Sequence, residues 1–173
     1  QACELITAER VLGTIRLGRD ALRALGMEGM PMAAAGLNAH CSENGLFGTE
    51  EAEAIAPAVE AARAEGINIT GPLPPDTVFV RAMAGEFALV VAMYHDQGHI
   101  PVKLSGFRMD PTTGRYTSLS GVNITIGLPV IRTSVDHGTA FDRAGRGTAN
   151  EESMADALRY AVRMANAKYG GGK

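Results

Sequence analysis

The uncharged segment from Phe87 to Met93 constrains the fold most strongly. A continuous apolar run of this kind is typical of a strand that is covered on both faces, as the strands of parallel sheets are. The polar segment from Tyr94 to His99 follows it directly. Ligands of open α/β sheets bind just beyond the carboxyl ends of the strands. The sequence therefore predicts a deeply buried strand whose end opens onto a binding edge.

Helical and strand patterns alternate along the remainder of the chain. Apolar residues at helical spacing, with Thr7 and Thr49 as caps and Gly26 and Gly66 after the ends, predict the first two helices. The predicted helices cover residues 7 to 25, 50 to 65 and 151 to 168, with a weak helix after a rigid loop at residues 71 to 76. The other predicted strands cover residues 31 to 37, 67 to 70, 122 to 128 and 130 to 133, with an exposed hairpin at residues 106 to 120. This order predicts an α/β layered fold with a largely parallel sheet.

Composition excludes several classes of protein. Apolar residues make up 46% of the 173 residues, charged residues make up 20%, and the net charge is −3. These values are ordinary for a globular protein, and the scattered basic residues predict neither a nucleic-acid partner nor a membrane surface. No apolar run is long enough to span a bilayer. Cys3 and Cys41 alone do not make a disulfide framework, which favours a reduced, cytoplasmic location.

The histidines are confined to polar clusters that follow predicted strands. Neutral imidazole is a good ligand for zinc and similar divalent metals, and carboxylates orient or supplement it. Two interpretations stay open, because the spacings match no local metal motif: the histidines bind a metal, or they are loop residues that hydrogen-bond the nearby backbone. The three clusters contain His40; His95, Asp96 and His99; and Asp136 and His137.

Three further features are candidates for binding anions or a nucleotide. Lys103 suits a phosphate or carboxylate contact or an acid–base role, and the alternative is a solvated lysine. Arg132 lies within an apolar strand pattern, so it is predicted to be buried against an anionic ligand or in a structural ion pair. The glycine-rich residues 137 to 147 could wrap a nucleotide, although they lack a dinucleotide fingerprint. Cys41 is interpreted as a spectator beside His40.

Several of these segments together resemble one family. Residues 94 to 98, 121 to 125 and 132 to 140 resemble 4-hydroxythreonine-4-phosphate dehydrogenases, and residues 38 to 40, 45 to 51 and 71 to 77 match further family segments. The resemblance covers nearly the whole chain. It implies the two-domain α/β fold of isocitrate and isopropylmalate dehydrogenases, and a homodimer with active sites between the subunits. It also implies that residues 1 to 173 are a carboxyl-terminal portion with parts of both lobes, and that the amino-terminal half is absent.

The resemblance also implies a set of site residues. A divalent metal (zinc, magnesium, cobalt or manganese) is expected on three histidines, two of which match His40 and His95, while the third would lie before Gln1. Family substrate contacts match Lys103, Asn123 and Arg132, and Asp76 and Asp96 match acidic residues of the site. The loop that resembles the adenine side of an NAD or NADP site contributes His137, Gly138, Thr139, Ala140, Asp142 and Asn150.

The implied reaction is oxidation and decarboxylation of a small phosphorylated hydroxy acid, 4-hydroxythreonine 4-phosphate or an analogue. A base removes the hydroxyl proton as hydride passes to NAD, and the resulting β-keto acid loses carbon dioxide. Lys103 is the predicted acid–base group, with Asp96 as its electrostatic partner and Asp76 as a further catalytic residue.

The family has branches, and three departures bear on which branch applies. Residues 98 to 103 and the insertion at residues 108 to 119 resemble enzymes of erythronate or threonate 4-phosphate, and a cis-dihydrodiol dehydrogenase branch shares part of the pattern. The sequence Asn38-Ala39-His40-Cys41 replaces the usual Asn-Pro-His-Ala. Because the third ligand is missing, a non-catalytic truncated module and a metal-binding protein without a redox role remain alternatives.

Overall fold

The computed structural model describes residues 3 to 114, 116 to 119, 121 to 139 and 141 to 170. The chain forms two compact units, Gln1–His99 and Ile100–Lys173. Within the described ranges, no helix combines the length and the apolar character that a membrane crossing requires. Both cysteines, Cys3 and Cys41, are free thiols.

A three-stranded sheet organises the first unit. Its strands are β1 (Met32–Ala35), β2 (Ile69–Leu73) and β3 (Leu89–Val91), in the order β2-β1-β3, and both pairs are parallel, which confirms the predicted parallel sheet. The prediction of the most buried strand is wrong. All four residues of the central strand β1 are buried, whereas β3 lies at an edge of this sheet and is partly exposed. Strand β2 also extends to Leu73, into the predicted loop.

The long helices of this unit begin and end largely as predicted. Helix α1 (Ala8–Ala24) is capped by Thr7, whose hydroxyl accepts a hydrogen bond from the Arg10 N–H at 3.2 Å. Gly26 has φ +69° and ends α1, since the left-handed conformation lets the chain turn back. Helix α2 (Ala56–Ala64) is preceded by a π-helical turn, Glu51–Ile55, whose N-cap is Glu50. The Thr49 carbonyl accepts the Glu53 N–H at 2.9 Å, so the helical hydrogen bonds begin at Thr49 as predicted, whereas a cap by the Thr49 side chain stays a prediction.

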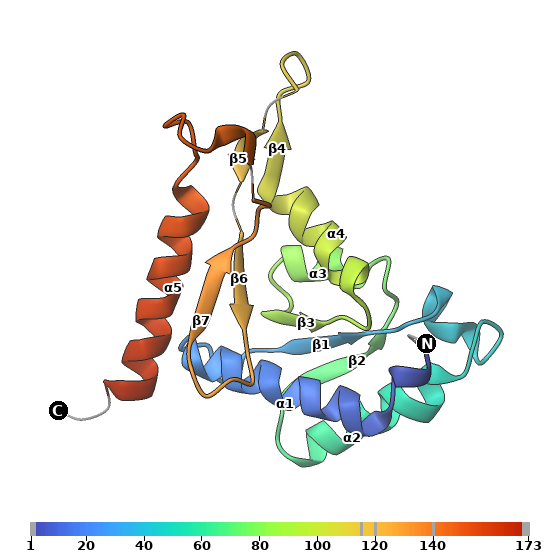
Figure 1. The fold of residues 1–173 in the computed structure, drawn as a ribbon. Helices are drawn as coiled ribbons and strands as arrows, with labels where there is room; N and C mark the ends of the chain where they lie inside the picture. Colours follow the sequence, from blue (N-terminus) through green and yellow to red (C-terminus); the bar gives the residue numbers. More distant parts are fainter. Residues whose placement is uncertain (1–2, 115, 120, 140, 171–173) are drawn as a thin grey trace. The chain divides into compact units, whose positions relative to one another are not determined.

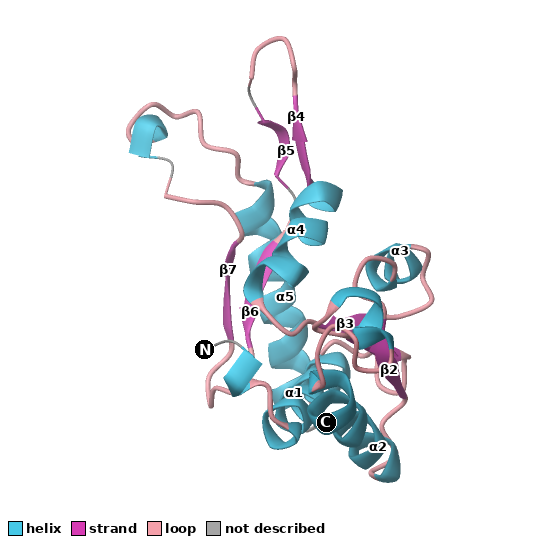
Figure 2. Ribbon diagram, turned by 90° about the vertical axis from the view of Figure 1, so that its right-hand side faces the viewer, coloured by secondary structure: helices cyan, strands magenta, loops and turns pink. Residues whose placement is uncertain are grey.

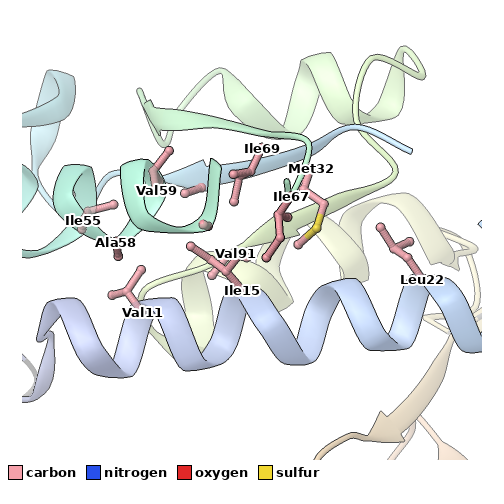
Figure 3. Packing of buried hydrophobic residues seen from close by; sticks show 12 residues of the cluster. Val11, Ile15, Leu22, Met32, Ile55, Ala58, Val59, Ile67, Ile69 and Val91 are labelled. Carbon is pink, nitrogen blue, oxygen red and sulfur yellow. The ribbon is translucent and has the colours of Figure 1, made fainter. Parts of the chain in front are cut away.

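Strand β1 divides the core of the first unit into two clusters. Met32 and Ala34 pack against α1 and α2, whereas Ala33 and Ala35 face α3 (Val78–Met83), since successive side chains of a strand point to opposite faces. Figure 1 shows α1 and α2 on one side of the sheet and α3 on the other. In Figure 3 the larger cluster joins α1, α2 and the sheet; its labelled residues are Val11, Ile15, Leu22, Met32, Ile55, Ala58, Val59, Ile67, Ile69 and Val91.

Substitution of Ile15 tests this cluster. The Ile15 side chain is 0% exposed, so Ile15→Val leaves a methyl-sized void that the close-packed neighbours fill only in part. We expect the free energy of unfolding in urea to fall by about 1 kcal/mol. Leu17→Ala on the exposed side of the same helix is the control, with an expected change within about 0.5 kcal/mol. Equal losses for the two variants would contradict the assignment of the core face.

Helix α4 (His95–Gly106) leads from the first unit into the second, so the polar segment after β3 begins a helix. The predicted hairpin is confirmed by β4 (Phe107–Met109) and β5 (Tyr116–Leu119), which pair antiparallel, and Arg108 and Met109 of β4 are exposed as predicted. A second antiparallel pair contains β6 (Val122–Thr125), which begins as predicted but ends earlier, and β7 (Arg132–Val135), which begins and ends later than predicted.

The last helix of the second unit covers this second strand pair. Helix α5 (Glu152–Tyr169) packs against β6 and β7 through a face that includes Ser153, Ala157 and Met164. Figure 2 shows this helix beside the β6–β7 pair and the long loop that precedes it. The remaining short helical turns are Cys3–Leu5, Ala39–Glu43 and Phe141–Arg143.

Candidate functional site

Three polar segments follow the carboxyl ends of the strands of the first sheet. His40 follows β1, Asp76 lies exposed in the turn after β2, and His95 and Asp96 follow β3. Because these strands are parallel neighbours, their carboxyl ends lie at one edge of the sheet, as predicted for the first two histidine clusters. The third cluster, which contains His137, instead follows β7 in the antiparallel pair of the second unit.

The loop after β1 has an unusual backbone. Five consecutive residues, from His40 to Asn44, have positive φ, with values between 45° and 63°. Only glycine adopts this conformation readily, and other L residues pay roughly 1–2 kcal/mol each. The His40 ring is exposed, with its centroid 6.3 Å from that of Phe47. A loop of this shape needs strong external hydrogen bonds to persist.

Glu51 holds the residues that lead into this loop. Its carboxylate is buried, and its Oε1 accepts the N–H groups of Leu37 at 2.8 Å and Asn38 at 2.7 Å. The Asn38 side-chain amide donates to Glu51 Oε2 at 2.9 Å and to Glu50 at 2.8 Å. This anchor was not identified from the sequence. The only local signal was the adjacent pair Glu50-Glu51 in a segment that resembles the family.

These contacts shift the pKa values of two groups, the Glu50 carboxyl and the Cys41 thiol. The hydrogen bond from the Asn38 amide holds the pKa of the Glu50 carboxyl below its ordinary value. Burial, followed by the negative charge of Glu51, raises the pKa of the Cys41 thiol. Since the thiolate is the nucleophilic form, the environment of Cys41 disfavours reactivity, which agrees with a spectator role.

Alkylation tests the assignment of Cys41. At neutral pH we expect iodoacetamide to modify exposed Cys3 several-fold faster than Cys41, because burial and Glu51 both disfavour the Cys41 thiolate. The rates are measured by mass spectrometry of the separated peptides. Glu51→Gln should increase the alkylation rate of Cys41 and leave that of Cys3 unchanged. If Cys41 reacted as fast as Cys3 in the unmodified protein, the raised pKa would be refuted.

The His95 ring is held on two sides. Its Nδ1 lies 2.7 Å from Asp96 Oδ1, and its ring stacks on His99 with centroids 4.1 Å apart and planes 12° apart. A carboxylate at Nδ1 favours the tautomer that carries the proton there, which leaves Nε2 as the metal-binding nitrogen. The His95 side chain is also exposed. The chemistry of this pair therefore fits a divalent metal ligand. Among the described residues, however, no group of three or more His, Cys, Asp or Glu side chains gathers to hold an ion.

The Gln97 side chain connects the end of β3 to the backbone segment that precedes His40. Its side chain is buried, and its Oε1 accepts the Met93 N–H at 2.6 Å. Its Nε2 donates to the carbonyl of Gly36 at 2.8 Å, one residue before the segment that Glu51 holds. Gln97 therefore fixes the start of α4, which carries His95, and Glu51 fixes the segment that leads to His40.

Lys103 belongs to the second unit, where its partner is Asp136. Its Nζ donates to Asp136 Oδ2 at 2.8 Å and to the Asp136 carbonyl, and it lies 4.3 Å from the centre of the Phe107 ring. The observed salt bridge of Lys103 is thus not with Asp96, its predicted partner, which hydrogen-bonds His95.

The two other predicted substrate contacts lie on the β6–β7 pair. Asn123 is exposed on β6. Arg132 is exposed at the start of β7, where its Nη1 donates to Thr125 Oγ1 at 2.6 Å. The predicted burial of Arg132 is therefore wrong in this chain, because β7 begins at the arginine and the apolar residues before it belong to the connecting loop.

The predicted cofactor loop has its own local hydrogen bonds. The Nδ1 of His137 lies 2.9 Å from the carbonyl oxygen of Gly138, and the Asn150 side chain accepts the Glu152 N–H at 2.9 Å at the start of α5. Gly138 and Thr139 are exposed. The backbone of Asp142 lies within a short helical turn, and Ala140 lies outside the described residues. Nucleotide binding by this loop stays a prediction.

A cavity of about 200 Å³ lies elsewhere in the first unit. It adjoins Met32, at the amino end of β1, and is therefore away from the edge that carries the histidines. It contains none of the predicted site residues; its lining is Arg19, Leu22, Arg23, Glu28, Gly29, Met30, Met32, Glu65, Gly66, Ile67 and Asn68.

Comparison with known proteins gives a consistent result. The family model described as pyridoxal phosphate biosynthetic protein PdxA matches residues 1–161. A 4-hydroxythreonine-4-phosphate dehydrogenase of Beijerinckia indica subsp. indica is 55% identical over 150 residues, which is 87% of this chain and 41% of the relative. A D-threonate 4-phosphate dehydrogenase of Cupriavidus necator is 54% identical over 153 residues, 88% of this chain and 43% of the relative.

A solved structure agrees with these relatives. The crystal structure of a 4-hydroxythreonine-4-phosphate dehydrogenase from Klebsiella pneumoniae has a TM-score of 0.78 and 48% sequence identity to this chain. The match covers 95% of this chain and 46% of that one. The chain thus spans about half the length of the relatives that it matches.

Proposed function

The chain belongs to the family of the pyridoxal phosphate biosynthetic protein PdxA, and on that premise we propose that it is part of a metal- and NAD(P)-dependent dehydrogenase. The proposed substrate is a four-carbon hydroxy acid with a phosphate on carbon 4. The names of the relatives carry this proposal, since they specify 4-hydroxythreonine 4-phosphate and D-threonate 4-phosphate. These compounds differ in bearing an amino or a hydroxyl group on carbon 2.

The loops at the edge of the first sheet would hold the metal. His40 and His95 offer exposed imidazoles, and Asp96 orients the ring of His95 through Nδ1. A bound divalent cation would polarise the substrate oxygen and stabilise negative charge that develops on it. Two histidines do not complete a three-residue site, so a further ligand must come from the remaining length of the family chain or from a second subunit.

Lys103, Asn123 and Arg132 would contact the substrate. Lysine and arginine are suited to phosphate and carboxylate, and Arg132 lies exposed at the start of β7. A base, for which Lys103 is the proposed group, would remove the proton from the carbon-3 hydroxyl while hydride passes from carbon 3 to the nicotinamide. The product is a β-keto acid, which loses carbon dioxide. Asp76 would act at the same sheet edge as His40 and His95.

The assembly is also a proposal. The two compact units would correspond to parts of the two lobes of the family fold, and the active enzyme would be a homodimer with sites between subunits. The loop from His137 to Asn150 would receive the adenine side of NAD or NADP. One observation favours a second candidate, a module without turnover: the described residues do not bring three metal-binding side chains together.

A direct assay of NADH formation tests the proposal. NADH formation is followed for the 173-residue chain alone and mixed with the other half of a relative, with D-threonate 4-phosphate, 4-hydroxythreonine 4-phosphate and a cis-dihydrodiol as substrates. We expect turnover only in the mixture, only with the phosphorylated acids, and only until a chelator removes the metal. Lys103→Met should lower turnover, and Lys168→Met is the matched control. Normal turnover by Lys103→Met would exclude the acid–base role, and no turnover in any mixture would favour the module.

A further inference from the structure

Asp136 accepts two hydrogen bonds from the Lys103 ammonium, which also lies over the Phe107 ring. An ammonium has three donors and no acceptor. Two of those donors form hydrogen bonds with Asp136, one with its carbonyl oxygen and one with Oδ2 at 2.8 Å. The Lys103 side chain remains 36% exposed, whereas that of Asp136 is 9% exposed. Lys103 is therefore fixed from the protein side and accessible from the solvent side.

Asp136 is fixed in turn by Ser153, near the start of α5. The Ser153 hydroxyl donates to the Gly121 carbonyl at 2.6 Å and accepts the Asp136 N–H at 3.3 Å. Ser153 is only 1% exposed, so these partners substitute for water. The single hydroxyl ties the residue before β6 to the residue after β7.

Gly121 provides the space for the Asp136 carboxylate. Its φ is +153°, and a Cβ built there would lie 3.0 Å from Asp136 Oδ2 and 3.2 Å from Asp136 Cβ. A side chain at this position would push the carboxylate away from its place beside Lys103.

From these contacts we propose that Asp136 is the positioning residue of Lys103, and that Ser153 and Gly121 hold Asp136 for that purpose. A lysine side chain has many rotamers, and a site is effective when its groups are locked before the ligand arrives. Asp136 fixes two of the three ammonium donors and leaves the third for the substrate. In the ammonium form this position donates to an anionic group of the substrate, and in the amine form it carries the lone pair that the proposed base requires. The importance of this arrangement rests on the proposed function, because that function assigns Lys103 to the substrate.

Competitive acylation of the lysines in the 173-residue chain tests the proposal. The sequence contains three lysines, and Lys168, which donates to the Pro129 carbonyl, is the internal reference. In Asp136→Asn we expect the rate at Lys103, relative to Lys168, to rise several-fold; Ser153→Ala should give a smaller rise. Asp156→Asn is the matched control, since Asp156 pairs with Arg159 and should leave the ratio unchanged. A merely structural role would change both lysines together, whereas an unchanged ratio in Asp136→Asn would overturn the proposal.

Two further measurements separate the possible failures. Should Asp136→Asn not fold, NMR of the ammonium groups in the unmodified chain decides the question: hydrogens of Lys103 should exchange with water more slowly than those of Lys168, and faster exchange would refute the positioning role. D-threonate 4-phosphate should protect Lys103 from acylation when the unmodified chain is mixed with the metal and the other half of a relative. If it does not, although Asp136→Asn still accelerates the reaction, the substrate role of Lys103 fails and the positioning by Asp136 stands.

Discussion

Gly71→Ala is expected to destabilise the first unit by about 3–5 kcal/mol. This cost is the sum of a strained backbone conformation and a steric clash of the new Cβ. Gly71 lies in β2 with φ +151°, a conformation that L side chains rarely adopt. Its Cβ would lie 2.7 Å from the backbone oxygen of Ala34 and 2.9 Å from the Ala34 Cβ. Ala34 is in the buried central strand, so the contact can be relieved only by moving β1 and β2 apart. The measurement is the free energy of unfolding from urea titration.

Two other glycines provide graded controls for Gly71. Gly29 has φ +79° but no atom near its would-be Cβ, so Gly29→Ala should cost only about 1 kcal/mol for the left-handed backbone. Gly13 lies within α1 and also has open space around it. Gly13→Ala should stabilise the chain by up to about 1 kcal/mol, because alanine is the better helix former. A loss at Gly71 no larger than that at Gly29 would show that β1 and β2 are not packed this closely.

Glu51→Ala is expected to cost about 2–4 kcal/mol, because it removes one carboxylate that accepts three hydrogen bonds. The N–H groups of Leu37 and Asn38 would be left without an acceptor in a partly buried site. The segment that leads into the left-handed loop at His40 would then lose its anchor. The unfolding free energy measures the first effect, and the affinity for zinc, followed by calorimetry, measures the second.

Two variants separate the charge of Glu51 from its shape. Glu51→Gln keeps an oxygen for the backbone N–H groups but places an NH₂ against the Asn38 amide, so it should cost less than alanine, about 1–2 kcal/mol. Glu53→Gln changes an exposed residue of the same π-helical turn and should stay within about 0.5 kcal/mol. The anchoring role of Glu51 would be lost if Glu51→Ala and Glu53→Gln behaved alike.

The parts of the fold that were predictable depend on local chemistry. Thr7 caps α1 and Gly26 ends it because capping and left-handed turns involve residues only a few positions apart. Strand burial was less predictable. An apolar pattern does not distinguish a central strand from an edge strand, so residues 87 to 93 were predicted to be more buried than β1. The order β2-β1-β3 decides this, and sequence periodicity does not contain that order.

The candidate site, too, could be predicted only in part. Residue type and position after a strand were enough to place His40 and His95 at one sheet edge. The residues that hold the site were not predicted, because their partners are distant in sequence. Glu51 accepts hydrogen bonds from Leu37 and Asn38. Gln97 donates a hydrogen bond to the Gly36 carbonyl, and Lys103 forms a salt bridge with Asp136. Such pairs follow from the tertiary fold and leave no periodic signal in the sequence.

The alternation of side chains in β1 restricts how this chain can change in length during evolution. Met32 and Ala34 belong to one cluster, and Ala33 and Ala35 belong to the other. Inserting or deleting one residue inside β1 would send every later side chain of the strand to the opposite face. Both clusters would exchange members at once, and His40 would follow the strand at a changed angle. Length variation among relatives should therefore accumulate in surface connections such as the turn between β4 and β5, and should avoid the central strand.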